Sequence, residues 1–234
     1  MKYFNYSKSI ITSFLFIFPL FIFYELIAFF KFSSSEFVIR NTADIIFRDI
    51  IRYFTDHLLL VQFLLIVLFF TYCIYTSSEK KLYKFKIKYM PLMFIEGLLY
   101  GFILVFILNG LDVFTKISFL FYDDYILSFY LCLGAGIWEE ILFRFILLNF
   151  LLYIFSFVVS NNLILLVLSI LFSSVVFSLF HYIGSFGELF TFYSFVIRVL
   201  GGVYLSIIYY YRGLGIAMFT HFIYDFILVS YPFI

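Results

Sequence analysis

The chain carries very little charge. Only 12% of its 234 residues are Asp, Glu, Lys or Arg, about half the share found in soluble domains, while 65% are hydrophobic. This composition excludes a water-soluble globular fold. The formal net charge of +1 gives no field that would attract nucleic acid, so we expect no nucleic-acid partner.

Cysteine, proline and glycine are also scarce. The two cysteines, Cys73 and Cys132, lie inside apolar segments, so the sequence predicts neither a disulfide framework nor a cysteine-type metal site. With 3 prolines and 11 glycines the chain has few places for flexible linkers. We therefore interpret residues 1–234 as a single membrane domain, and we expect no metal and no other cofactor.

What the chain does contain is a series of long apolar runs. They cover residues 9–31, 58–76, 90–109, 125–154, 162–183, 193–211 and 213–233. About 18–20 apolar residues span a bilayer as a helix, and a helix satisfies the backbone polar groups of such a run. The fourth run is long enough for one tilted helix or two shorter ones. The sequence predicts an all-α, polytopic integral membrane bundle of six to eight transmembrane helices, with the active-site cavity inside the membrane.

Two stretches between these runs are charged. Residues 33–57 interleave charged and apolar positions at spacings of three and four, which predicts a helix lying in the membrane interface. Residues 79–88 are rich in lysine, so the positive-inside rule places this loop in the cytoplasm. The abundance of Ile, Phe, Tyr, Lys and Asn is typical of an AT-rich bacterial genome. We expect a multi-pass protein of the bacterial plasma membrane.

The densest charge inside an apolar run lies in residues 125–154. Glu139 and Glu140 are adjacent, and Arg144 follows one helical turn later. Charged side chains at bilayer depth are costly and usually mark a function. Glu140 and Arg144 share a helix face, which predicts an ion pair. Glu139 is then left without this partner and is free to act as a base. The alternative is a buried ion pair that only fixes helix packing.

Two of the three histidines lie in apolar runs. His181 follows Phe177 by four residues at the end of one run, and His221 precedes Asp225 by four residues in the last. A single histidine at a helix end is more often an interfacial polar residue than a catalytic one. The pair of His221 and Asp225 is harder to explain in this way, because both side chains need buried partners. We assign no role to His57.

Four further charges accompany the apolar runs. Glu96 lies in the third run and Arg198 in the sixth, where each either lines the same site or extends toward the membrane surface. Glu188 and Arg212 lie at predicted loops, and we expect both to be solvated.

The three motifs, in this order, resemble those of the CAAX prenyl protease type II family. This is a broad group of intramembrane glutamate proteases that includes bacterial bacteriocin-processing and immunity proteins. The similarity runs over residues 125–230, while the residues before it contribute hydrophobicity but no motif. The matching positions are Glu139, Glu140 and Arg144, then Phe177 and His181, then His221 and Asp225.

The resemblance implies a metal-independent intramembrane endopeptidase. In this family the first glutamate and the histidine of the second motif, here Glu139 and His181, activate a water molecule. That water attacks a peptide carbonyl without a covalent intermediate. The last motif, here His221 and Asp225, would hold the oxyanion of the tetrahedral intermediate. The expected partners are the lipid bilayer and a peptide or membrane-protein substrate of unknown identity.

The remaining motif residues have supporting roles by the same resemblance, with one departure from the family. Glu140 and Arg144 would orient Glu139. The last motif of the family usually ends in asparagine, where this chain has Asp225. An ionised aspartate cannot donate a hydrogen bond to an oxyanion. Either Asp225 is protonated, or it orients His221 and leaves that residue to bind the oxyanion alone.

Three other functions use the same residues. Glu139, His181 and His221 contain the two histidines and one carboxylate of a common catalytic zinc site, although the chain lacks a His-Glu-x-x-His helix. A non-catalytic peptide-binding or bacteriocin-immunity protein would use the polar cavity to capture a partner. A transporter would use Glu139 and Glu140 in a proton or cation relay, although the chain shows no repeated halves.

Overall fold

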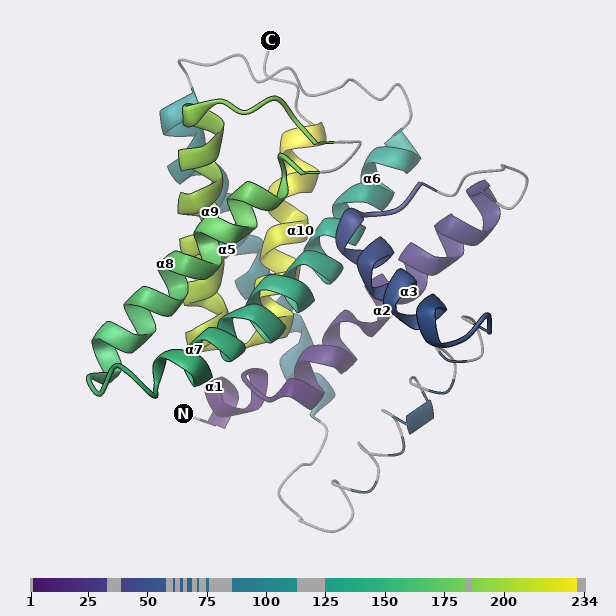
Figure 1. The fold of residues 1–234 in the computed structure, drawn as a ribbon. Coiled ribbons are helices and arrows are strands. Elements are labelled where there is room, and N and C mark those ends of the chain that lie inside the picture. The colour runs from purple at the N-terminus through teal and green to yellow at the C-terminus, as the bar shows by residue number, and fades with distance from the viewer. Residues whose placement is uncertain are drawn as a thin grey trace.

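The computed structural model describes residues 2–32, 39–57, 86–112, 125–183 and 187–230, together with isolated positions between 61 and 75. Within these residues the chain is helical and forms no strand. In chain order the elements are α1 (Lys2–Ser7), α2 (Ile10–Phe32), α3 (Thr42–Phe54), the 3-10 turn η1 (Ile87–Tyr89), α5 (Met90–Asp112), α6 (Tyr125–Gly134), the π-helical segments η2 (Ala135–Glu139) and η3 (Ile141–Leu148), α7 (Asn149–Phe155), α8 (Asn162–Phe180), α9 (Phe192–Arg212) and α10 (Leu214–Ser230) (Figure 1).

Several of the predicted apolar runs form membrane-length helices. Among the described residues, 4 helices are long and apolar enough to cross a membrane: Ile10–Lys31, Ile87–Leu108, Asn162–Phe180 and Phe192–Arg212. Leu214–Val229 is a shorter apolar helix. The run predicted at 58–76 and most of the lysine-rich loop lie outside the described residues. The all-helical membrane bundle is confirmed, while the count of six to eight spans and the orientation stay predictions.

The fourth predicted run is one helix rather than two. Residues 125–155 are helical without a break, but their middle consists of the π-helical segments η2 and η3. A π-helix bonds each residue to the fifth before it, and such turns are rare outside functional sites. Glu139 ends η2 and Arg144 lies within η3. The charged motif of this apolar run therefore lies in its least regular helical turns.

Helix α10 lies at the centre of the bundle, in contact with α2, α5, α6, η2 and α9 (Figure 1). Every residue from 212 to 223 is buried, as expected for a mainly apolar segment at the centre of a bundle. Gly136 lets η2 approach α10 closely, because a Cβ atom there would lie 2.8 Å from the Cβ of Phe222 and 2.9 Å from the Met218 carbonyl oxygen. This contact brings Glu140 next to His221.

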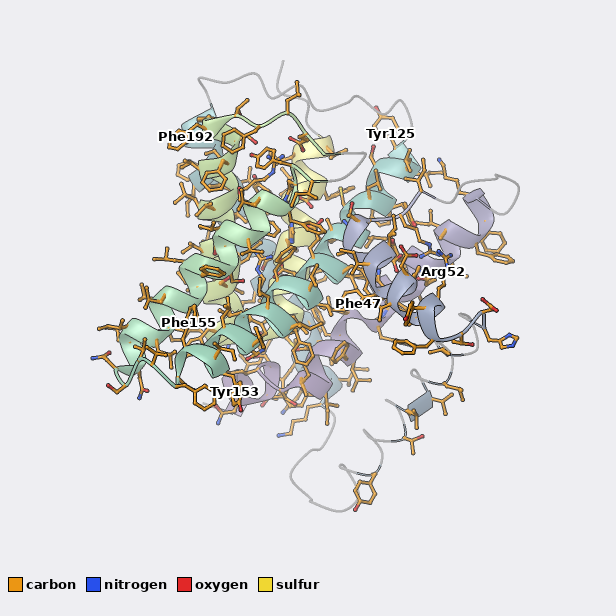
Figure 2. The ribbon with its side chains drawn as sticks, in the orientation of Figure 1. Phe47, Arg52, Tyr125, Tyr153, Phe155 and Phe192 are labelled. Atoms are coloured by element: carbon orange, nitrogen blue, oxygen red, sulfur yellow. The ribbon has the colours of Figure 1, made fainter. Side chains whose placement is uncertain are left out.

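The outer surface of the bundle is apolar. Figure 2 shows carbon-rich side chains projecting from the helices, with Tyr125 and Phe192 at one end of the molecule and Tyr153 at the other. These three aromatic residues are 83%, 75% and 63% exposed, respectively. A surface of this kind fits a bilayer and not water, because exposed apolar area of such extent would associate in water.

Helix α3 forms where the interfacial helix was predicted, but two of its charged residues point into the protein. Asp44 and Arg48 are buried, whereas Ile50, Tyr53 and Phe54 are exposed. Asp44 and Arg48 turn inward because α2 carries a charged side chain that pairs with Arg48. A shallow hollow on the outer side of α3 is lined by Ile46, Asp49, Ile50, Tyr53 and Phe54, none of which belongs to the predicted site.

The prediction that Arg212 is solvated is wrong. Its side chain is 6% exposed, and its Nη2 donates to Glu96 Oε2 at 2.7 Å while its Nε donates to Glu96 Oε1. Tyr3 also donates to Glu96 Oε2, at 2.6 Å. Gly213 turns the chain with φ 94°, where a Cβ atom would lie 2.8 Å from the Cα of Lys8. The buried carboxylate of Glu96 is stabilised by a positive charge, and Arg212 provides that charge. This ion pair is separate from the predicted site.

Candidate active site

Glu139 is the first of the predicted site residues, and its two carboxylate oxygens have different surroundings. The side chain is 8% exposed. Its Oε1 accepts a hydrogen bond of 2.8 Å from Nδ2 of Asn41, which precedes α3. Its Oε2 lies 3.8 Å from Nε2 of His181 and accepts no hydrogen bond within the described part of the chain. Glu139 was expected to lack Arg144 as a partner, and the ion pair of Arg144 is with Glu140. The contact of Oε1 with Asn41 was not predicted.

His181 caps the C-terminal end of α8 and presents one nitrogen to Glu139. Its Nδ1 lies 2.9 Å from the carbonyl oxygen of Phe177. A carbonyl only accepts, so Nδ1 carries the hydrogen and the neutral ring keeps its lone pair on Nε2. The distance of 3.8 Å from Nε2 to Glu139 is too long for a direct hydrogen bond and short enough for one water to bridge. Such a water would donate a hydrogen to each of two bases.

Glu140, Arg144 and His221 form the second half of the cluster. The predicted ion pair is present, with 2.8 Å between Arg144 Nη1 and Glu140 Oε1. The same oxygen lies 2.7 Å from Nδ1 of His221. Both Glu140 and Arg144 are almost completely buried. Glu140 thus holds His221, whereas the contact that holds Glu139 comes from Asn41.

Phe177 joins the three motifs at their centre. The guanidinium carbon of Arg144 lies 4.3 Å from the centre of the Phe177 ring, within the range of a cation–π contact. The same ring packs edge-on against the His181 ring, with 4.9 Å between ring centres, and against the His221 ring, with 6.0 Å between ring centres. The aromatic residue of the second motif therefore packs against one residue from each of the other two motifs.

Asp225 faces the remaining nitrogen of His221. The distance from His221 Nε2 to Asp225 Oδ2 is 3.4 Å, and the aspartate side chain is 24% exposed. Nδ1 of His221 already donates to Glu140, so a favourable contact with Asp225 needs a hydrogen on Nε2 or on the aspartate carboxyl. In the described residues no group of three or more His, Cys, Asp or Glu side chains could hold a metal ion.

Several charged residues lie apart from this cluster. Arg198 donates from Nη2 to Glu188 at 2.6 Å and from Nη1 to the Tyr182 hydroxyl at 3.0 Å. The Glu188 amide donates to the His181 carbonyl oxygen at 3.0 Å. Arg198 therefore contacts Glu188 and Tyr182, and Glu188 contacts the backbone of His181. His57, to which no role was assigned, is exposed.

Asn41 is the functional candidate that the sequence did not identify. Asn41-Thr-Ala-Asp44 before an amphipathic run is a typical helix start, and Asn41 does cap α3 through Oδ1. This signal predicts where the helix begins. It carries no information about the Glu139 contact, because 98 positions separate the two residues.

The comparisons agree with the motifs. Residues 121–227 match the family model described as type II CAAX prenyl endopeptidase Rce1-like. This part of the chain is similar to that family. The Rce1-like region contains all three motifs and excludes α1, α2, α3 and α5. No curated protein and no solved structure matches the chain. The Rce1-like family is a protease family. In this chain the matching residues are part of a helical membrane protein.

Proposed function

We propose that this Rce1-like protein is an intramembrane endopeptidase in which Glu139 and His181 activate a water molecule. The observation that carries the proposal is the separation of 3.8 Å between Glu139 Oε2 and His181 Nε2. Both atoms act as hydrogen-bond acceptors, and both belong to side chains fixed by another bond. General bases work through positioned groups of this kind, within reach of the proton by one water.

The reaction begins with proton transfer to Glu139. Oε2 takes a proton from the water while the water oxygen attacks the peptide carbonyl carbon, so a C–O bond forms and the carbonyl oxygen becomes an oxyanion. His181 Nε2 accepts the second hydrogen of the water and orients the attack. Glu139 then passes its proton to the amide nitrogen, the C–N bond breaks, and a carboxyl product and an amine leave.

His221 and Asp225 stabilise the oxyanion in this mechanism. The donor is a hydrogen on His221 Nε2 or on the Asp225 carboxyl, at the pair separated by 3.4 Å. Glu140 and Arg144 hold the His221 ring from its other side. The enzyme needs no metal, works in the bacterial plasma membrane, and cleaves a peptide or a membrane protein.

A second candidate function is peptide binding without cleavage, as in an immunity protein. The observation that favours it is the position of Asp225, which faces the one nitrogen of His221 that Glu140 does not occupy. If the hydrogen on His221 Nε2 is donated to Asp225, it is not available to stabilise an oxyanion. The same buried polar groups would then capture a peptide and release it intact.

The test is cleavage of a panel of quenched fluorescent peptides by the purified protein in proteoliposomes. The panel contains farnesylated peptides with a C-terminal CAAX sequence and unmodified apolar peptides. We expect cleavage to continue in the presence of 1,10-phenanthroline. In His181→Ala the rate should fall at least about 100-fold, which is the lower end of the range for losing a positioned acid–base group. Cleavage of no peptide, combined with equal peptide binding by the wild type and His181→Ala, would establish the binding function instead.

A further inference from the structure

Asn41 lies outside the Rce1-like region and is in direct contact with the proposed base. Its Nδ2 donates to Glu139 Oε1 at 2.8 Å. Its Oδ1 accepts from the amide of Ala43 at 2.9 Å as the N-cap of α3. The side-chain oxygen of Asn41 accepts one hydrogen bond and its nitrogen donates the other, so only one of the two flipped orientations of the amide satisfies both contacts. The side chain of Asn41 is thus fixed with its NH₂ group toward Glu139.

A buried ionic network holds the start of α3 in place. Glu25 of α2 accepts from both Nη atoms of Arg40 at 3.1 Å and from Arg48 at 2.6 Å. Asp44, which is fully buried, accepts from Arg40 at 2.9 Å, from Arg48 at 2.7 Å and from the Tyr24 hydroxyl at 2.9 Å. Because these bonds join α3 to the membrane-length helix α2, the residue before α3 has little freedom to move.

The contact also requires a small residue beneath it. A Cβ atom on Gly134 would lie 2.9 Å from the Tyr24 ring and 3.0 Å from the Cβ of Asn41. Glycine at this position lets α6 approach the segment that carries Asn41. The helix of the base and the N-terminal segment are therefore packed closely enough for the side chains of Asn41 and Glu139 to meet.

We propose that Asn41 is a positioning residue for the base, and this inference rests on the proposed function. By holding Oε1, Asn41 fixes the rotation of the Glu139 carboxylate. Oε2, which has no hydrogen bond among the described residues, is then directed at His181 and at the water between them. The N-terminal region therefore takes part in the chemistry of the Rce1-like region, although it contains none of the family motifs.

Two substitutions separate this role from helix capping. Ser and Asp cap helices about as well as Asn, so Asn41→Ser and Asn41→Asp both keep the cap. Serine is too short to reach Glu139, whereas aspartate places a second carboxylate against it. The matched control is Asn161→Ser, since Asn161 caps α8 in the same manner, accepting from the amides of Leu163 and Ile164, and it is exposed.

The experiment measures kcat, KM and the unfolding temperature of each variant with the peptide of the panel that the wild type cleaves fastest. Asn41→Ser should lower kcat about 10- to 100-fold with KM unchanged, the effect of losing a hydrogen bond to a charged group in the reaction. Asn41→Asp should lower kcat further. Asn161→Ser should match the wild type in both kcat and unfolding temperature. The Asn41 variants keep the cap but lose a hydrogen bond to a buried carboxylate, so their unfolding temperatures should fall by a few degrees and leave the protein folded under the assay conditions.

The remaining outcomes contradict one proposal or both. If Glu139→Gln is inactive while Asn41→Ser and Asn41→Asp keep the wild-type kcat, the positioning role is wrong and the proposed function stands. If Asn41→Ser loses activity only together with its unfolding temperature and Asn41→Asp is fully active, Asn41 has a capping role alone. If Glu139→Gln cleaves as fast as the wild type, the proposed function fails and the role of Asn41 fails with it.

Discussion

The N-terminal region, residues 2–57, and the Rce1-like region both bury charge, but they treat it in opposite ways. In the N-terminal region both oxygens of Asp44 and both oxygens of Glu25 accept hydrogen bonds from arginine. In the Rce1-like region Glu139 Oε2, Glu140 Oε2 and Arg144 Nε are buried without a hydrogen bond to the described residues.

This difference separates a structural network from the one that we propose to be functional. A satisfied polar network rigidifies the protein, whereas unsatisfied buried groups are costly and persist mainly where a ligand or reaction uses them. Neither region is independent, however. The rigid N-terminal network supports Asn41, and Asn41 contacts the one oxygen of Glu139 that the proposed reaction does not use.

Arg144→Ala should have the largest effect on stability. Removing one partner of a buried ion pair costs about 3–5 kcal/mol, because the other charge stays buried. The ring of Phe177 would also lose its cation. We expect chemical unfolding to show this loss, together with lower peptide cleavage. Full stability with lost cleavage would instead place Arg144 in contact with the substrate.

Asp44→Asn should destabilise the N-terminal region by a smaller amount. The amide keeps the size of the aspartate but loses the charge that pairs with Arg40 and Arg48. Hydrogen bonds to charged groups contribute about 1.5–3 kcal/mol, and Glu25 still binds both arginines. Unfolding in denaturant measures this change, and an unchanged free energy of unfolding would show that the network is not structural.

Asp225→Asn tests the departure from the family motif. The amide supplies a hydrogen-bond donor beside the proposed oxyanion, and a single donor of this kind is worth roughly 10²–10³ in rate elsewhere. We expect a measurable rise in kcat with little change in stability. Loss of cleavage would mean that the carboxylate of Asp225 is needed to orient His221.

Asp49→Ala should have the smallest effect. Asp49 pairs with Arg52 at 3.2 Å on the outer face of α3, and both side chains are 60% exposed. An exposed pair contributes at most about 1 kcal/mol. We expect wild-type cleavage and nearly wild-type stability. A large loss would show that the outer face of α3 has a role beyond the contacts described here.

The sequence predicted features that depend on local spacing. Apolar length predicted α2, α8 and α9, and the separation of four positions predicted the ion pair of Glu140 and Arg144. The contacts it missed are long-range. Arg212 and Glu96 are 116 positions apart, and Asn41 lies 98 positions from Glu139. The π-helical segments were also missed, because apolar periodicity does not distinguish them from an α-helix.

The most direct test of the proposed base compares the same substitution at two adjacent glutamates. Glu139→Gln keeps an oxygen for Asn41 but removes the base, so cleavage should fall about 10²- to 10⁴-fold while the unfolding temperature is unchanged. Glu140→Gln removes the charge shared by Arg144 and His221, so its unfolding temperature should fall. Cleavage by Glu139→Gln at the wild-type rate, measured in the same proteoliposomes, would contradict the account.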